Sequence, residues 1–247
     1  QVAASSMEKQ LVLGLTQPLA TVLERVDELA SVTLRIVLGL CLVCIALAVL
    51  LAALAGCSSL LGPKDTPTIF APEIAATADP AWPSVTWPLG TVRPTSARIL
   101  DGTRIAVSPV PGELQVYKSA LWARTPPEML EETVLRMLED SGKIPAVARQ
   151  GSGIGAEYRL VMDIRHFESD YSGGGTPSAV IEVTAKLLHV SDQSVAGSRT
   201  FRQVQPAAGI EVGRVAEAFG QALGTISREV AGWTLATGNE HHTKAHR

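Results

Sequence analysis

The stretch TPPEMLEETVLRMLEDSG, residues 125–142, decides how the middle of this 247-residue chain folds. Thr125 and Glu128 have the spacing of a capping box, and Pro126 stands in the first turn, where its missing N–H costs nothing. An apolar stripe at helical spacing follows, formed by Leu130, Val134, Met137 and Leu138. Gly142 comes directly after the last turn, as glycine often does at a helix end. The sequence therefore predicts a capped helix with one buried face.

Short runs with strand character surround this helix. They lie at residues 104–110 before it and at residues 144–149, 158–167, 178–190 and 196–204 after it. In several of them apolar residues alternate with polar ones, which is the period of a half-buried strand. A last apolar stripe with helical period runs from residue 210 to residue 233. This order of elements predicts an α/β domain in layers, with a mixed sheet that helices must cover.

Two aromatic residues, Tyr117 and Trp122, fall in a stretch that we interpret as a loop before the capped helix. Because loops often carry function, their side chains are candidates for contact with a partner or with lipid. The alternative is that they simply cap the core.

A long apolar run ends at Leu54-Ala55-Gly56-Cys57. It follows Arg35 and contains no charged residue from position 36 to position 56. A basic flank, an apolar centre and a small-residue exit are the parts of a secretory signal peptide. The tetrapeptide resembles a bacterial lipobox, in which Cys57 becomes the acylated first residue of the mature protein and the three residues before it form the cleavage motif. The run is also long enough for a spanning helix, so an uncleaved single-pass anchor is the alternative.

Composition divides the chain into five parts, which are an uncertain extension with an amphipathic helical pattern at 1–31, a lipoprotein signal peptide or membrane segment at 32–56, a proline-rich tether at 57–83, an α/β domain at 84–236 and a disordered tail at 237–247. Within the tether, residues 68–70 have the character of a short first strand. Trp82 and Trp87 are expected to pack onto the domain. We attribute His241 and His242 to the polarity of the tail.

Charge and motif spacing argue against several classes of function. From Cys57 onward the chain has 18 basic and 20 acidic residues, whereas nucleic-acid binding needs a basic face. The glycine-rich residues 151–155 precede a predicted strand, although a dinucleotide-binding turn precedes a helix. Asp163 and His166 should face opposite sides of a strand, so they cannot share a metal ion without a bulge. No nucleophile–base motif is found, and we expect a protein that is not an enzyme, with no cofactor and no metal.

The domain resembles the ABC-type transport auxiliary lipoprotein family, which includes the PqiC-type lipoproteins. The resemblance covers about residues 57–235 and is carried by the lipobox ending at Cys57, ARILDGTRIAVSPVPGELQVY (97–117), ALWARTPPEMLEETVLRMLEDSGKIPAV (120–147), YRLVMDIRHFESD (158–170) and the closing helix from Val212.

This resemblance implies a layered αβα (Rossmann-like) fold and a non-enzymatic role. The protein would be the auxiliary component of an MCE/ABC-type intermembrane lipid transport system, with an MCE-domain protein and the ABC permease and ATPase as partners. An acylated Cys57, carrying for example palmitate, would anchor it to membrane lipid. Ser58, rather than Asp, after that cysteine favours the outer membrane and a domain that faces the periplasm. A ring-forming homo-oligomer is one option. The alternative function is an inner-membrane single-pass protein with a periplasmic ligand-binding or sensing domain.

Overall fold

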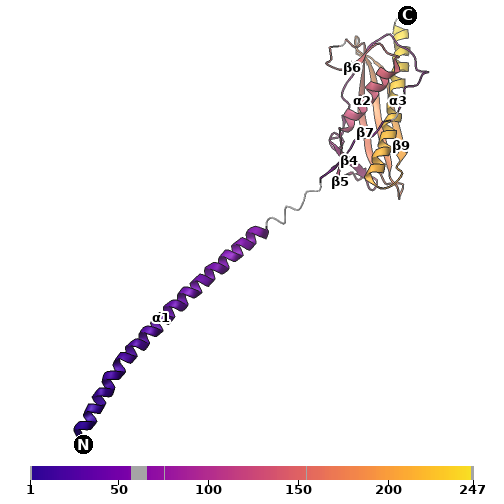
Figure 1. Cartoon of the computed structure of the whole chain (residues 1–247). Coiled ribbons are helices and arrows are strands. Elements are labelled where there is room, and N and C mark those ends of the chain that lie inside the picture. Colours follow the sequence, from indigo (N-terminus) through magenta and orange to yellow (C-terminus); the bar gives the residue numbers. More distant parts are fainter. Residues whose placement is uncertain (1, 57–65, 75, 154, 246–247) are drawn as a thin grey trace. The chain divides into compact units, whose positions relative to one another are not determined.

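The computed structural model describes residues 2–56, 66–74, 76–153 and 155–245 (Figure 1). The chain forms two compact units, residues 1–64 and residues 65–247. Each unit is described by itself.

The described part of the first unit is a single helix, α1 (Val2–Gly56). Its residues from Glu24 to Leu51 have a mean hydropathy of 2.9, and this part is long and apolar enough to cross a membrane. A signal sequence near an N-terminus has the same properties. The large apolar side chains of this part, such as Leu29 and Leu40, are exposed. The sequence predicts a change of segment after residue 31, but the helix runs through that position without a break.

The second unit is an α/β domain built on β7 (Tyr158–Asp170), the longest strand of a nine-stranded sheet. On one side β7 pairs antiparallel along its whole length with β8 (Ser178–His189), which pairs in turn with β9 (Val195–Pro206). On the other side β7 pairs with three short parallel strands, one after another. From the start of β7 to its end these are β2 (Leu89–Thr91), β3 (Thr95–Ser96) and β4 (Arg104–Ser108).

Two short arms extend the sheet beyond these strands. Parallel to β2 lies β6 (Val147–Arg149), and antiparallel to β4 lies β5 (Gln115–Trp122). The edge next to β5 is β1 (Thr68–Phe70), which runs parallel to it. The sheet thus contains both parallel and antiparallel pairs, and the predicted α/β class with a mixed sheet is confirmed. The strand expected at 144–149 is shorter than predicted, because Pro145 lacks the N–H that a ladder needs.

Two helices cover the apolar face of this sheet (Figure 1). The predicted capping box opens α2 (Pro126–Ser141), where Thr125 N–H donates to Glu128 Oε2 at 3.0 Å, and Gly142 ends the helix at a φ of 61°. The second helix is α3 (Val212–Ala245), which packs on β8 and β9 and against α2. Both helices that the structure describes in the domain thus lie on the same side of the sheet.

The described part of the predicted proline-rich tether, from residue 66 onward, belongs to the domain. After β1, residues 71–74 and 76–87 run along α3 and form what we call the strap. A Cβ added at Gly220 would lie 2.5 Å from the Glu73 carbonyl oxygen, and one at Gly238 would lie 2.3 Å from the Trp87 ring. The expected packing of Trp82 and Trp87 on the domain is confirmed. The predicted boundary at residue 84 is wrong, because ordered pairing begins with β1, and residues 57–65 lie outside the described part.

The predicted disordered tail is also wrong over its described part, because α3 continues to Ala245. Its last turns are held at the start of β7. The hydroxyl of Tyr158 lies 2.9 Å from His241 Nδ1, and His242 Nδ1 lies 2.8 Å from a carboxylate oxygen of Glu157. The histidines that suggested a polar tail are therefore partners of polar groups on the domain.

Candidate interaction site

The structure describes only the backbone of the predicted cleavage motif and does not describe the predicted acylation site. Cys57 is among the residues that are not described. The backbone of Leu54, Ala55 and Gly56 forms the C-terminal end of α1, and the side chains of these residues are not described. Cleavage before Cys57 and its acylation therefore stay predictions.

Trp122 is a core residue and not an exposed contact. It ends strand β5, so the predicted loop is wrong, and its side chain is only 2% exposed. The indole packs edge-on against Phe219 at 5.2 Å and Phe167 at 6.3 Å between ring centroids. The sequence pattern did not predict this strand, because its pairing with β4 shifts register and Ser119 has a φ of 53°. Both features interrupt the alternation of inward and outward side chains.

Tyr117, on the same strand, is half-buried. Its hydroxyl donates to Ser169 Oγ at 3.0 Å and lies 3.2 Å from the hydroxyl of Tyr171. Burial of the ring raises the pKa of the Tyr117 phenol above its ordinary value of 10.0. The hydroxyl is thus occupied within the domain, and contact of Tyr117 with a partner stays a prediction.

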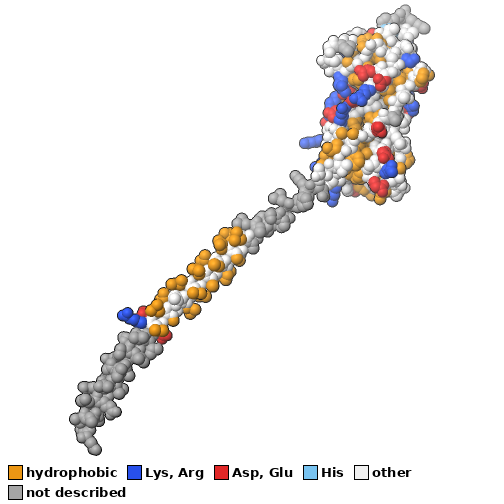
Figure 2. Space-filling model, in the orientation of Figure 1, with side chains coloured by type: hydrophobic (Ala, Val, Ile, Leu, Met, Phe, Trp, Pro, Cys, Tyr) orange, Lys and Arg blue, Asp and Glu red, His pale blue; other side chains and the backbone are white. Residues whose placement is uncertain are grey.

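A charged cleft of about 700 Å³ opens where β2 and β6 end and α2 begins. Ligands commonly bind at the carboxyl ends of parallel strands in α/β sheets, because loops and helix starts converge there. The cleft is lined by Thr91, Val92, Arg93, Arg124, Glu128, Glu131, Glu132, Arg149 and Gln150. Figure 2 shows basic and acidic side chains together on this part of the domain. We call it the α2 cleft.

The carboxylate at the bottom of the α2 cleft belongs to Glu131, which is 5% exposed. Thr91 Oγ1 donates to its Oε1 at 3.0 Å, and Arg149 Nε donates to its Oε2 at 3.3 Å. At the rim, Arg93 donates to Asp101 at 2.6 Å, and this hydrogen bond raises the pKa of Arg93. The buried carboxylate is paired, as buried charges need to be. It is therefore part of the framework of the cleft.

A second hollow of about 440 Å³ lies beside the first, between the strap and α2. Its lining includes the apolar side chains of Ile74, Met129 and Met137. Arg124 and Arg136 both pair with the carboxylate of Glu132 on its polar side. Apolar surface next to ion pairs that solvent can reach is what a binding surface offers. The sequence analysis predicted neither hollow, because it recognised no strand at residues 89–91 and placed most of the strap in a tether.

The acid and histidine cluster on β7 does not form a metal site. A bulge between Ile164 and His166 puts Asp163 and His166 opposite Thr184 and Glu182, which lie on one face of β8. The expectation that Asp163 and His166 face opposite sides is therefore wrong. Each has its own partner, since Thr95 Oγ1 donates to Asp163 at 2.6 Å and His166 pairs with Glu168. Among the described residues there is no group of three side chains that could hold a metal ion.

Comparisons with known proteins agree with this architecture. The crystal structure of protein XCC0632 from Xanthomonas campestris is 50% identical in sequence, with a TM-score of 0.69, and the match covers 71% of this chain and 99% of that one. A further crystal structure, of an uncharacterized protein, matches with a TM-score of 0.52 at 15% identity over 67% of this chain and 97% of that one, which shows the fold alone.

A curated relative comes from Bradyrhizobium diazoefficiens, the uncharacterized protein bll6063, which is 26% identical over 161 residues. The match covers 63% of this chain but only 41% of that relative. The model of the family described as "ABC-type transport auxiliary lipoprotein component" matches residues 68–231, from β1 into α3. This chain belongs to the ABC-type transport auxiliary lipoprotein component family.

Proposed function

We propose that this protein is a membrane-anchored lipoprotein that docks an MCE/ABC-type lipid transport system at the outer membrane, without catalytic activity of its own. The single observation that carries the proposal is the family match over nearly the whole domain. The family description implies association with an ABC transport system and a place in the cell envelope. The lipid, the MCE partner and the choice of membrane are parts of the proposal.

Two features of the molecule support this role. The apolar part of α1 comes directly before the Leu54-Ala55-Gly56-Cys57 motif, so acylation would leave the α/β domain tied to a membrane through a short link. The domain itself offers the α2 cleft and the neighbouring hollow, which are lined by ion pairs and apolar side chains. Such surfaces suit docking to another protein of the transport system.

The anchor is tested by mass spectrometry of the protein purified from membranes. We expect a mature chain that begins at an acylated Cys57, and we expect Cys57→Ala to leave the protein uncleaved and without the lipid. Cys44→Ala, in the same apolar run, is the matched control and should be processed normally. A wild-type chain that retains residues 1–56 would contradict the lipoprotein and favour the alternative.

That alternative is an inner-membrane single-pass protein with a periplasmic ligand-binding or sensing domain. One observation favours it, because residues 24–51 of α1 are long enough to span a membrane. N-terminal sequencing separates the two functions directly.

The partner is tested by affinity purification of the tagged chain from solubilised membranes. We expect an MCE-domain protein together with the ABC permease and ATPase. Arg124→Glu reverses a charge shared by both hollows and should reduce recovery of these partners, whereas Arg202→Glu, on the opposite face of the sheet, should not. Equal recovery with both variants would remove the α2 cleft from the docking surface.

A further inference from the structure

Most of the exposed large apolar side chains of the domain gather at one end. Seven such side chains are exposed among the described residues from 66 onward. Five of them we call the proximal surface, namely Ile69, Val110, Leu114, Val204 and Ile210. Leu114 is 39% exposed and the other four are more than half exposed. Surface apolar residues that cluster in this way commonly mark an interaction site, whereas scattered ones need no explanation.

Backbone contacts place these residues at the same end of the sheet. Val110 and Leu114 lie in the turn between β4 and β5, which begins where β4 and β7 end side by side. Tyr171, after β7, donates its N–H to the Ser108 carbonyl at 3.0 Å. Ala207, in the connection that holds Ile210, donates to the Pro177 carbonyl at 2.9 Å. The β4–β5 turn, the β7–β8 turn and the start of α3 are therefore neighbours.

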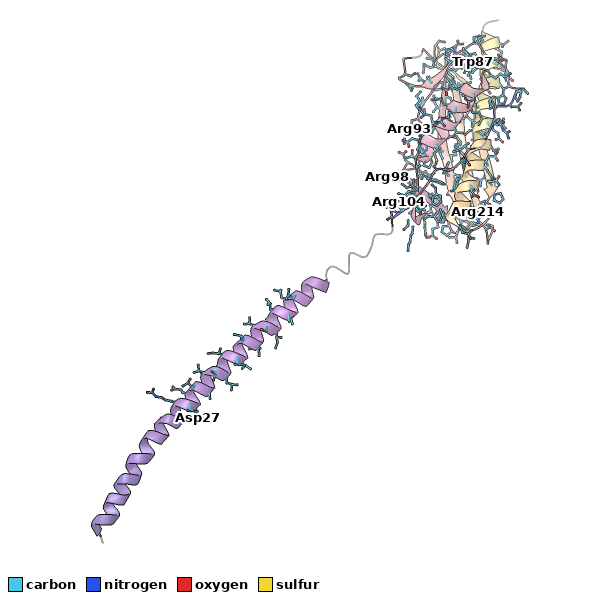
Figure 3. All side chains as sticks on the ribbon, viewed as in Figure 1. Asp27, Trp87, Arg93, Arg98, Arg104 and Arg214 are labelled. Atoms are coloured by element: carbon cyan, nitrogen blue, oxygen red, sulfur yellow. The ribbon has the colours of Figure 1, made fainter. Side chains whose placement is uncertain are left out.

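The chain from the anchor enters the domain at this end. Ile69 belongs to β1, and the next residue, Phe70, lies 3.8 Å from the position of a Cβ on Gly213, in the first turn of α3. Only ten residues lie between Cys57 and Thr68, and the eleven Cα-to-Cα steps of a fully extended chain from one to the other reach at most about 40 Å. Trp87 and the last turns of α3 are at the other, distal end, and Figure 3 shows Trp87 and Arg214 at opposite ends of the domain.

The charges of the proximal surface set the kind of membrane contact that it can make. Glu113 and Glu211 are exposed beside the apolar tips, and Arg214 is paired with Glu217 at 3.0 Å. Arg104 is also exposed at this end, on β4 opposite Leu121, which pairs with Ile69 (Figure 3). These charges are of both signs, without the basic excess with which proteins bind anionic lipids. Contact with lipid would come from burial of aliphatic tips at the boundary between headgroups and acyl chains, which depends little on salt.

We propose that the proximal surface rests on the membrane to which the chain is anchored, with its aliphatic tips at the interface of zwitterionic lipids. The proposal rests on membrane attachment before residue 66, which is part of the proposed function. It holds for an acylated Cys57 and for an uncleaved helix alike, because both attach at the same end of the domain. Lipid is the favoured occupant because the short link keeps this end of the domain close to the bilayer.

The test places an environment-sensitive fluorophore (NBD) on single introduced cysteines of the full chain, in a Cys41→Ala/Cys44→Ala background, reconstituted in phosphatidylcholine vesicles. A sample without an introduced cysteine corrects for any label on Cys57. The labelled variants are Leu114→Cys and Ile210→Cys. The matched control is Val195→Cys, which is also an exposed aliphatic residue but lies at the distal end beside β8. Sedimentation with the vesicles reports the anchor independently.

We expect emission from positions 114 and 210 to shift to the blue, to be quenched by spin-labelled lipid and to be unaffected by added salt. Position 195 should keep the emission of a label in water. Equal emission at all three positions in protein that sediments with vesicles would overturn the inference and leave the anchor intact. Protection of positions 114 and 210 from iodide without quenching by spin-labelled lipid would show that protein covers the surface, and would also overturn it. Protein that fails to sediment would overturn both the anchor and the inference.

Discussion

The two ends of the α/β domain differ in what their aromatic and apolar side chains contact. At the distal end the rings of Trp87, Tyr158, His189 and His241 form one cluster, with centroids 4.6 to 5.8 Å apart. At the proximal end aliphatic side chains such as Ile210 and Val110 are exposed to solvent. In the distal cluster the Tyr158 hydroxyl lies 2.9 Å from His241 Nδ1, and the rings cover one another. The apolar groups of the proximal surface have no such cover among the described residues. The distal end is therefore closed by the domain itself, while the proximal end is suited to an outside partner.

The contacts of α3 with the residues that precede β2 also differ between its first turn and the rest of its length. At Gly213, near the proximal end, an added Cβ would make an ordinary contact of 3.8 Å with Phe70. At Gly232 and Gly238 it would lie 2.5 Å or less from the indoles of Trp82 and Trp87. Glycine is thus required where the strap lies against α3, at Gly220 as well as at Gly232 and Gly238, and is not required at Gly213, which faces β1 before the strap begins.

The largest expected effect comes from removing the side chain of Trp87 at the distal end. Trp87 is 1% exposed, so Trp87→Ala should lower the free energy of unfolding by about 3–5 kcal/mol through lost burial and the cavity left behind. Leu114→Ala at the proximal surface should change it by no more than about 0.5 kcal/mol. Urea unfolding followed by tryptophan fluorescence measures both, because all four tryptophans of the chain lie in the domain. Equal losses would remove the distinction between the two ends.

A smaller effect is expected from adding a methyl group to α3 at Gly238. Gly238→Ala should lower the free energy of unfolding by about 1–3 kcal/mol, because the methyl group overlaps the Trp87 ring. Gly213→Ala meets no such obstacle, and alanine favours a helix over glycine by about 0.5–1 kcal/mol. We therefore expect it to leave stability unchanged or to raise it. Thermal unfolding of the two variants in parallel measures both effects. A destabilised Gly213→Ala would contradict the difference between the two positions.

The smallest expected effect concerns a hydroxyl at each end. Tyr158→Phe removes the hydrogen bond to His241 and should cost about 1 kcal/mol. Burial raises the pKa of Tyr158 to about 12, above its ordinary value of 10.0. The tyrosine therefore stabilises the fold fully below pH 10, and this contribution is lost as the pH rises toward 12.

Alkaline titration compares the two ends with the same chemistry. Wild-type stability should fall above pH 10, and Tyr158→Phe should reduce the slope of that fall. Tyr117→Phe should do the same, because burial also raises the pKa of Tyr117. Urea midpoints measured from pH 8 to pH 11 report the slopes. An unchanged slope in both variants would mean that these phenols do not hold their protons in the folded state.

Local signals predicted part of this fold correctly and failed where distant segments decide it. The capping box at Thr125 and Glu128 and the alternation that starts at Tyr158 depend on near neighbours, so they can be read directly. The three-residue strand β2 and the two-residue strand β3 form because β7 offers them hydrogen-bonding partners, and stretches this short have no recognisable strand pattern of their own. The helical end of α3 depends on Glu157 and Tyr158, which lie far away in sequence.

The candidate interaction site could be predicted from the sequence only in part, for the same reason. Trp122 lies within the stretch 120–147 that carries the family resemblance, but its burial depends on Phe167 and Phe219 from two other elements. Thr91 and Glu131, forty residues apart, meet in the α2 cleft through the pairing of β2 with β6 and β7. Spacing in the sequence does not reveal such a meeting without a topology.

The strap imposes an order on the synthesis of this protein. Trp82 and Trp87 are made early, but the surfaces that cover them include Gly232, Gly238 and the ring of Tyr158. A nascent chain therefore carries two uncovered indoles until residues 232–238 have emerged, about 150 residues later. Contacts of such long sequence separation form late and slowly. The domain closes only when its last helix arrives, and a message truncated before that helix would yield a chain that exposes these indoles.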